Sequence, residues 1–242
     1  MQDIVLELNI FRWLHVLAMA WWLGGEWGVF HASTNVANSN LNIDERKRAL
    51  AVGFQIDILP RSMILVLPLL GIHMAALHGI SPITGYGLMI SWIFFLSWIG
   101  LVLSAFYFKG TAMGWKLTMI DERIRYVVIP LFIIIGIIGV TTRSFPSLTI
   151  FGEGAILFEM KETSMWFALK VLLFGLLLCI GLALRIIMRR WVIGFQRLAK
   201  EGSTPEVESY FAGPLAIGRK LAYIYWMGIA TVAFFGVTKI IV

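Results

Sequence analysis

The chain has 242 residues, of which 59% are hydrophobic and 14% charged, and its mean hydropathy is +0.84. A soluble domain carries about a quarter charged residues, so this composition excludes an ordinary soluble protein. The net charge of +6 does not indicate nucleic-acid binding, because the Lys and Arg residues are concentrated between long apolar blocks.

Six apolar blocks are each long enough to cross the hydrocarbon of a bilayer, which takes about 20 helical residues. We therefore expect an all-α fold, an integral membrane bundle of six transmembrane helices that forms one domain over 1–242 within a lipid bilayer. The acidic residues Asp3 and Glu7 at the start argue against a cleaved signal peptide. The expected spans are 9–31, 60–80, 86–108, 124–143, 164–187 and 220–241.

Basic residues alternate between the expected loops. The loops after the first, third and fifth spans, counted with Arg125, Arg185 and Lys220 at the adjoining span ends, hold 14 of the 20 Lys and Arg residues. Loops rich in Lys and Arg remain in the cytoplasm, so we expect both chain termini to lie outside. The expected localisation is the bacterial inner membrane. The opposite loop, 144–163, is acidic, with Glu153, Glu159 and Glu162 against Lys161, which suits a basic partner such as a cytochrome c.

Several local signals predict how the helices begin, end and approach each other. The Asn-rich stretch 35–42 predicts a turn, and Pro60 suits the first turn of the second span. Thr204 predicts the start of a short helix, which Gly213-Pro214 would end. Gly24 and Gly28 form a small-xxx-small pair, which favours close approach of a neighbouring helix.

Ionisable residues within the spans mark the candidate site, because a bilayer core penalises such side chains unless they serve a function. His15 and His73 lie on neighbouring antiparallel spans at similar expected depth. On a helix, Phe11, His15, Trp22 and Glu26 share one stripe. The other two histidines, His31 and His78, are expected at interfaces. Lys170 lies at a depth close to that of the histidine pair, and Glu26 and Arg61 are expected to pair.

Two histidines at matched depth favour a haem b site, because neutral imidazoles ligate haem iron and a bis-histidine pair supports electron transfer. Lys170 is the alternative second ligand or a contact to a haem propionate. A copper site at His73, Met74 and His78 is the other metal hypothesis, since thioether and imidazole ligands favour Cu(I). The single cysteine, Cys179, excludes an intrachain disulfide and Cys-based zinc or iron–sulfur sites.

Two short motifs resemble a known family. FRWLHVL at 11–17, followed by WLGG at 22–25, resembles the first helix of the CopD and HemJ group of membrane proteins. WFALK at 166–170 resembles the Trp-x-x-x-Lys segment of HemJ-type protoporphyrinogen oxidases. The HemJ resemblance implies haem binding through His15 and Lys170, and the CopD resemblance implies copper uptake. HemJ-type proteins have four spans, whereas six are expected here.

Three functions remain open on this basis. The first is a haem b membrane redox protein, leaning to an oxidoreductase, which takes electrons from a quinol or porphyrinogen and belongs to a respiratory assembly. The second is a CopD-like copper transporter. The third is a non-catalytic membrane subunit that binds other membrane subunits or a cytochrome c. The residues do not identify the electron donor or the electron acceptor.

Overall fold

The computed structural model describes residues 2–145, 148–149, 156–158 and 161–239. Its helices confirm the expected all-α bundle with six membrane-spanning segments, because six helical stretches are long and apolar enough to cross a bilayer. The helices are α1 Gln2–Val36, α2 Ile43–Leu77, α3 Gly85–Tyr107, α4 Ala112–Thr142, α5 Met165–Met188, α6 Arg190–Glu201 and α7 Pro205–Thr238.

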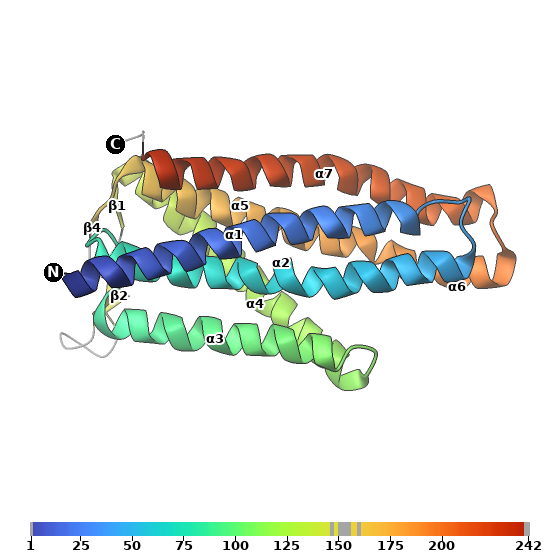
Figure 1. Ribbon diagram of the computed structural model, residues 1–242, viewed down its shortest axis with the longest axis horizontal. Helices are drawn as coiled ribbons and strands as arrows, with labels where there is room; N and C mark the ends of the chain where they lie inside the picture. The colour runs from blue at the N-terminus through green and yellow to red at the C-terminus, as the bar shows by residue number, and fades with distance from the viewer. Residues whose placement is uncertain (1, 146–147, 150–155, 159–160, 240–242) are drawn as a thin grey trace.

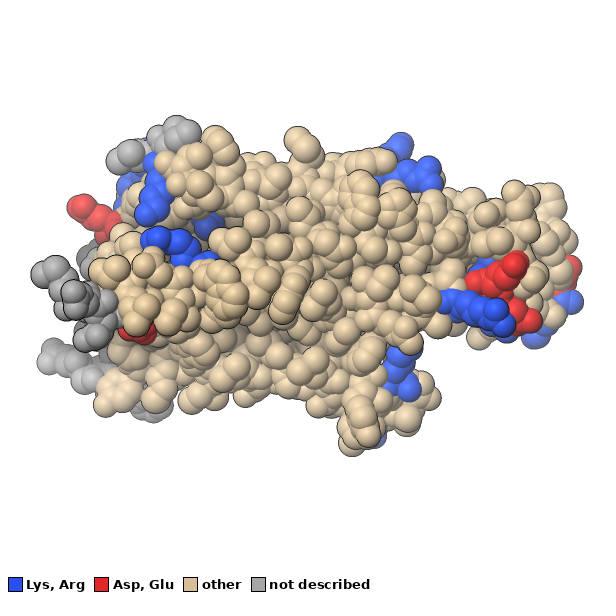
Figure 2. All heavy atoms as spheres, in the orientation of Figure 1, with Lys and Arg blue, Asp and Glu red and all other residues tan. Residues whose placement is uncertain are grey.

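The described helices lie side by side along one axis, with both chain ends at the same end of the bundle (Figure 1). We call this the terminal end and the opposite one the α6 end. Figure 2 shows an uncharged middle zone on the face in view, with Lys, Arg, Asp and Glu gathered toward the two ends. That distribution is the one a bilayer requires of its protein surface. The chain is an integral membrane protein.

Short strands connect α4 to α5 at the terminal end. β1 (Ser144–Phe145) pairs antiparallel with β4 (Lys161–Glu162), and β2 (Leu148–Thr149) pairs with β3 (Ile156–Phe158). This is the segment expected to be an acidic loop. Glu153 and Glu159, which contribute to its expected charge, lie outside the described residues.

Several helices are longer than the bilayer is thick. α2 has 35 residues and is therefore about 52 Å long, against about 30 Å of hydrocarbon. The excess projects beyond the α3–α4 turn at the α6 end (Figure 1). We call this projection the distal lobe: it contains the end of α1, the start of α2, α6 and the start of α7. Its core residues are Val36, Trp191, Leu198, Val207 and Phe211.

The distal lobe is held by one buried arginine. Arg46 donates from Nε to the Val36 carbonyl at 2.7 Å, pairs with Glu208 at 2.9 Å and stacks on the Phe211 ring. The expected Asn-rich turn lies beside it. Asn42 caps the start of α2, and the Glu45 carboxylate accepts a hydrogen bond from the Asn42 backbone N–H. This capping box fixes where the second helix begins.

Two proline predictions are wrong. Pro60 lies in the middle of α2 rather than at its start, and Pro214 lies inside α7 rather than ending a short helix. Both follow from the extra helix length, which moves each helix start into the distal lobe. Pro60 is accommodated because Gly25 faces it: a Cβ at Gly25 would lie 2.5 Å from the Pro60 ring.

The glycine prediction for α1 is half right. Gly28 faces Ile56 of α2, as expected of a small residue at a helix crossing. Gly24 faces open space instead, and Gly25 takes its place at the contact. The pairs Gly25–Pro60, Gly28–Ile56 and Ala32–Gly53 fix a constant antiparallel register between α1 and α2.

Candidate functional site

The expected polar stripe of α1 faces the bundle interior. Trp22 is buried, its indole nitrogen donates to the Tyr225 hydroxyl of α7 at 3.2 Å, and its ring contacts Phe174 of α5. His15 lies two turns closer to the terminal end on the same face, and Glu26 lies one turn closer to the α6 end. One helix face thus presents ionisable groups at two depths.

His15 lies where α1 meets α2. A Cβ on Gly71 would lie 3.5 Å from the ring carbon Cε1 of His15, and the ring interacts with the backbone of Leu67. Its other ring nitrogen, Nδ1, is buried and has no hydrogen-bond partner among the described residues. A buried polar atom without a partner is costly, so this nitrogen calls for an explanation.

Lys170 of α5 is the charged group that the structure brings to His15. It is close enough for its charge to act on the imidazole. The end of its side chain lies against α7, where a Cβ on Gly236 would come within 2.6 Å of Nζ. Within the described part of the chain, Lys170 forms no ion pair.

His73 lies slightly nearer the terminal end than His15. Phe11 stacks on His73 with ring centres 4.2 Å apart, and in this register His15 is level with Leu70. The three-residue offset corresponds to about 4.5 Å along the helix. Across the described residues, no hydrogen bond or ring contact joins the two histidines.

Both ring nitrogens of His73 are engaged by other residues. The Trp92 indole donates to Nδ1 at 3.1 Å, which makes Nδ1 an acceptor and places the ring hydrogen on Nε2. Nε2 then donates to the Glu7 carboxylate at 3.0 Å. We call His15 and Lys170 together with Glu7, His73 and Trp92 the terminal site. Its two halves are the His15–Lys170 pair and the His73 triad.

The residues of the copper hypothesis do not form a closed set. His73 is engaged as described, and His78 is exposed at the end of α2. Partial burial and the nearby charges of Lys239 and Arg12 lower the pKa of His78. Positive neighbours also oppose a bound cation. Among the residues that the structure describes, no group of three or more His, Cys, Asp or Glu side chains is arranged to hold a metal ion.

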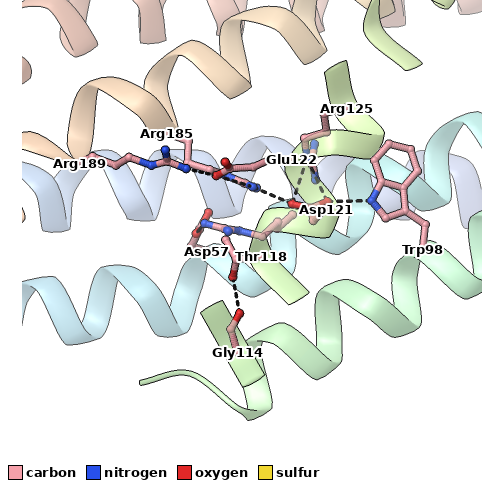
Figure 3. Close-up of polar contacts among 10 residues, drawn as sticks. Asp57, Trp98, Gly114, Thr118, Asp121, Glu122, Arg125, Arg185 and Arg189 are labelled. Atoms are coloured by element: carbon pink, nitrogen blue, oxygen red, sulfur yellow. Dashed lines mark hydrogen bonds and ion pairs between the residues drawn. The ribbon is translucent and has the colours of Figure 1, made fainter. Parts of the chain in front are cut away.

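A second group of polar residues lies toward the α6 end. Asp121 of α4, only 3% exposed, accepts hydrogen bonds from Trp98 of α3 at 2.7 Å, Arg125 at 3.1 Å and Arg185 of α5 at 2.6 Å (Figure 3). The neighbouring Glu122 pairs with Arg189. Asp121 lies 21 residues from the end of α4, about 30 Å, which places it near the edge of the hydrocarbon.

α2 extends this group with a further pair. Asp57 and Arg61 form an ion pair one turn apart, and Arg61 also interacts with the charges of Asp121, Arg125 and Arg185. The expected Glu26–Arg61 pair is an interaction at longer range, since Asp57 is the carboxylate in contact with Arg61. We call Asp57, Arg61, Asp121, Glu122, Arg125, Arg185 and Arg189 the arginine–carboxylate cluster.

The sequence did not reveal most of these partners. Arg125 and Arg185 were counted as loop charges, whereas both lie on membrane helices and contact Asp121. The spacing of Asp121 and Arg125, four residues apart on a helix, was the available signal. Glu7 lies two turns before His15 on the same stripe, which was the signal for the His73 triad.

Comparison with protein-family models, with curated proteins and with solved structures finds no match. The residues of the terminal site offer a haem two groups, the buried Nδ1 of His15 and the amine of Lys170, and Gly71 and Gly236 present no side chain to them.

Proposed function

We propose that this chain is a haem b-binding membrane redox protein in which His15 is an axial ligand. The observation that carries the proposal is the buried Nδ1 of His15, which has no partner among the described residues. In a bilayer core such a group is expensive and usually functional. A neutral imidazole nitrogen is a ligand of haem iron.

Lys170 completes the proposed site. Its charge acts on the His15 imidazole and it forms no ion pair among the described residues, so its amine is available as the second ligand or as the partner of a haem propionate. A bound haem b would supply one-electron oxidation and reduction at its iron. The residues that face His15 and the end of Lys170 are Gly71 and Gly236, which have no side chain that would displace either group.

His73 takes a supporting position in this proposal. Trp92 and Glu7 occupy its two ring nitrogens, so ligation by His73 would break one of these hydrogen bonds. Lys170 is therefore preferred over His73 as the second group near the iron. The preference for Lys170 over His73 agrees with the resemblance of the WFALK segment to HemJ-type proteins, which implies a role for Lys170 in haem binding.

The orientation, location and partners belong to the same proposal. Basic residues between the first and second spans, the third and fourth, and the fifth and sixth support a cytoplasmic α6 end, with both termini outside. The resemblance to the CopD and HemJ group supports the bacterial inner membrane as the location. A quinol or porphyrinogen is the proposed electron donor, and a cytochrome c is a proposed partner at the terminal end.

The test is the visible spectrum of the purified protein, expressed with ample haem, in its air-oxidised and dithionite-reduced forms. We expect a Soret band. His15→Ala should abolish it, and Lys170→Ala should shift or broaden it, whereas His73→Ala should leave a Soret band. His78→Ala is the matched control, because His78 is exposed and should leave the spectrum unchanged.

Two results would contradict the proposal. A featureless spectrum of the haem-supplied protein would exclude a haem site. An unchanged spectrum of His15→Ala would exclude His15 as the ligand. Loss of the sharp reduced bands in His73→Ala, with Lys170→Ala unaffected, would instead identify the His15–His73 pair.

A further inference from the structure

Glu26 is set apart from the other carboxylates near the α6 end of the membrane. Asp57, Asp121 and Glu122 each contact an arginine. Among the described residues, Glu26 has no ion pair within 4 Å. It nevertheless lies on the interior stripe of α1, half-buried within a membrane-spanning helix. An intramembrane carboxylate in this position has a function by default.

The groups around Glu26 come from several helices. Trp22 lies one turn away on the same helix, and Arg61 of α2 and the Tyr225 hydroxyl of α7 interact with the charge of Glu26. Arg61 is paired with Asp57, and Arg61 and Tyr225 both interact with the charges of Arg125 and Arg185. Glu26 thus interacts with the charges of the arginine–carboxylate cluster but, among the described residues, forms no ion pair with it.

The charge balance of the region depends on Glu26. Four arginines (Arg61, Arg125, Arg185 and Arg189) stand against three carboxylates within the cluster. An ionised Glu26 brings the carboxylates to four and balances the charge. A protonated Glu26 leaves one positive charge in excess. Proton binding at this one carboxyl therefore changes the net charge that α1, α2, α4 and α5 share.

Asp57 gives this region a connection to water. The side chains of Asp57 and Arg61 are 22% and 27% exposed, and Arg189 is 44% exposed. Asp57 lies one turn nearer the distal lobe than Arg61, and the Gly25–Pro60 and Gly28–Ile56 contacts place Asp57 at nearly the depth of Glu26 on the adjacent helix. A partly exposed carboxylate there can take a proton from water and pass it to a neighbouring group.

We propose that Glu26 is a proton-binding site that exchanges protons with water at the α6 end by way of Asp57. In the loading step, an O–H bond forms at the Glu26 carboxylate and the proton comes from water through the Asp57 carboxyl. Asp57 returns to its ionised form and pairs again with Arg61. No electron is transferred, and the step does not depend on the proposed haem.

The test is infrared difference spectroscopy of the reconstituted protein between acidic and alkaline buffer. We expect a carboxylic acid C=O band that shifts in D₂O and is lost in Glu26→Gln. In Asp57→Asn the band should remain and its exchange in D₂O should be several-fold slower, while Asp57→Glu should restore the rate. Glu206→Gln is the matched control, because Glu206 is exposed and pairs with the surface residue Arg197.

The proposal is overturned if no band is lost in Glu26→Gln, or if Asp57→Asn exchanges at the wild-type rate. A hydrophobic carbodiimide, which modifies protonated carboxyl groups in lipid, gives a second measurement on the unmutated protein. Mass spectrometry should find the adduct on Glu26 and more of it at acidic pH. An unmodified Glu26 at every pH would also overturn the proposal. The visible spectrum of Glu26→Gln should match the wild type, which separates this test from that of the haem.

Discussion

The terminal site and the arginine–carboxylate cluster are both polar regions inside a membrane bundle, but their hydrogen bonding differs. Asp121 has three donors from three helices, and every carboxylate of the cluster contacts an arginine. In the terminal site, His15 has a buried nitrogen without a partner among the described residues, and Lys170 forms no ion pair there.

The difference indicates separate roles. Charges taken out of water are tolerated when their partners are complete, and such a network joins the helices that supply it. The cluster, with Trp98, therefore holds α3, α4 and α5 together near one membrane edge. An incomplete site gains nothing for stability, and ionisable groups within a membrane usually mark a functional site. Substitutions should thus cost stability in the cluster and ligand binding at the terminal site.

The largest effect is expected for Asp121→Asn. The amide keeps the shape of the side chain but removes the charge that Arg125 and Arg185 share. Leaving buried charges without their counter-charge costs about 3–5 kcal/mol. Unfolding of the purified protein in mixed detergent micelles should show this loss. Glu206→Gln serves as the control at an exposed pair and should produce no measurable change. A small effect of Asp121→Asn would mean that the cluster is not a structural network.

The next effect is expected for Trp98→Phe. The Trp98 indole donates to Asp121 at 2.7 Å, and a hydrogen bond to a charged group contributes about 1.5–3 kcal/mol. The same unfolding measurement should show a loss in this range. In Asp121→Asn protein the further loss from Trp98→Phe should be smaller, because the accepting group is no longer charged. Equal losses in the two backgrounds would show that Trp98 acts by packing alone.

Trp92→Phe is the matched substitution in the terminal site. It removes a hydrogen bond to the neutral ring of His73, which contributes about 0.5–1.5 kcal/mol. We expect a smaller loss of stability than for Trp98→Phe. Histidine NMR of the variant should show His73 with a mixture of the two tautomers, since the donor that fixes the ring hydrogen on Nε2 is gone. A single unchanged tautomer would mean that Glu7 alone sets it.

The sequence predicted the fold class well because the relevant signal is local. Uncharged blocks of about 20 residues identify membrane spans without knowledge of their neighbours. The same signal sets no upper limit on helix length. The residues that extend α2 back to Ile43 are polar, and their helix is stabilised by the distal lobe and the Asn42 cap. Pro60 was therefore assigned to a helix start that lies 17 residues earlier.

The site was less predictable because it depends on the register between helices. His15 and His73 seemed level when counted from the span ends, but the contacts of Gly25 with Pro60 and Gly28 with Ile56 offset them by about three residues. Likewise, Arg125 and Arg185 were counted among the loop charges, but in the structure both contact the buried Asp121. The helix register and these ion pairs depend on side-chain packing between segments far apart in the sequence, so the sequence of one segment does not predict them.

The smallest effect on stability, and the sharpest contrast between the two regions, is expected for His15→Phe. Phenylalanine removes a buried nitrogen that has no partner among the described residues and keeps an aromatic ring. In protein prepared without haem, we expect stability to be unchanged or raised by up to about 1 kcal/mol, since burying an unsatisfied polar atom is costly. In haem-supplied protein, the wild type should be the more stable of the two, because only it gains the free energy of ligand binding. A clear loss of stability without haem would show that His15 is a structural residue, and the contrast between the terminal site and the cluster would then fail.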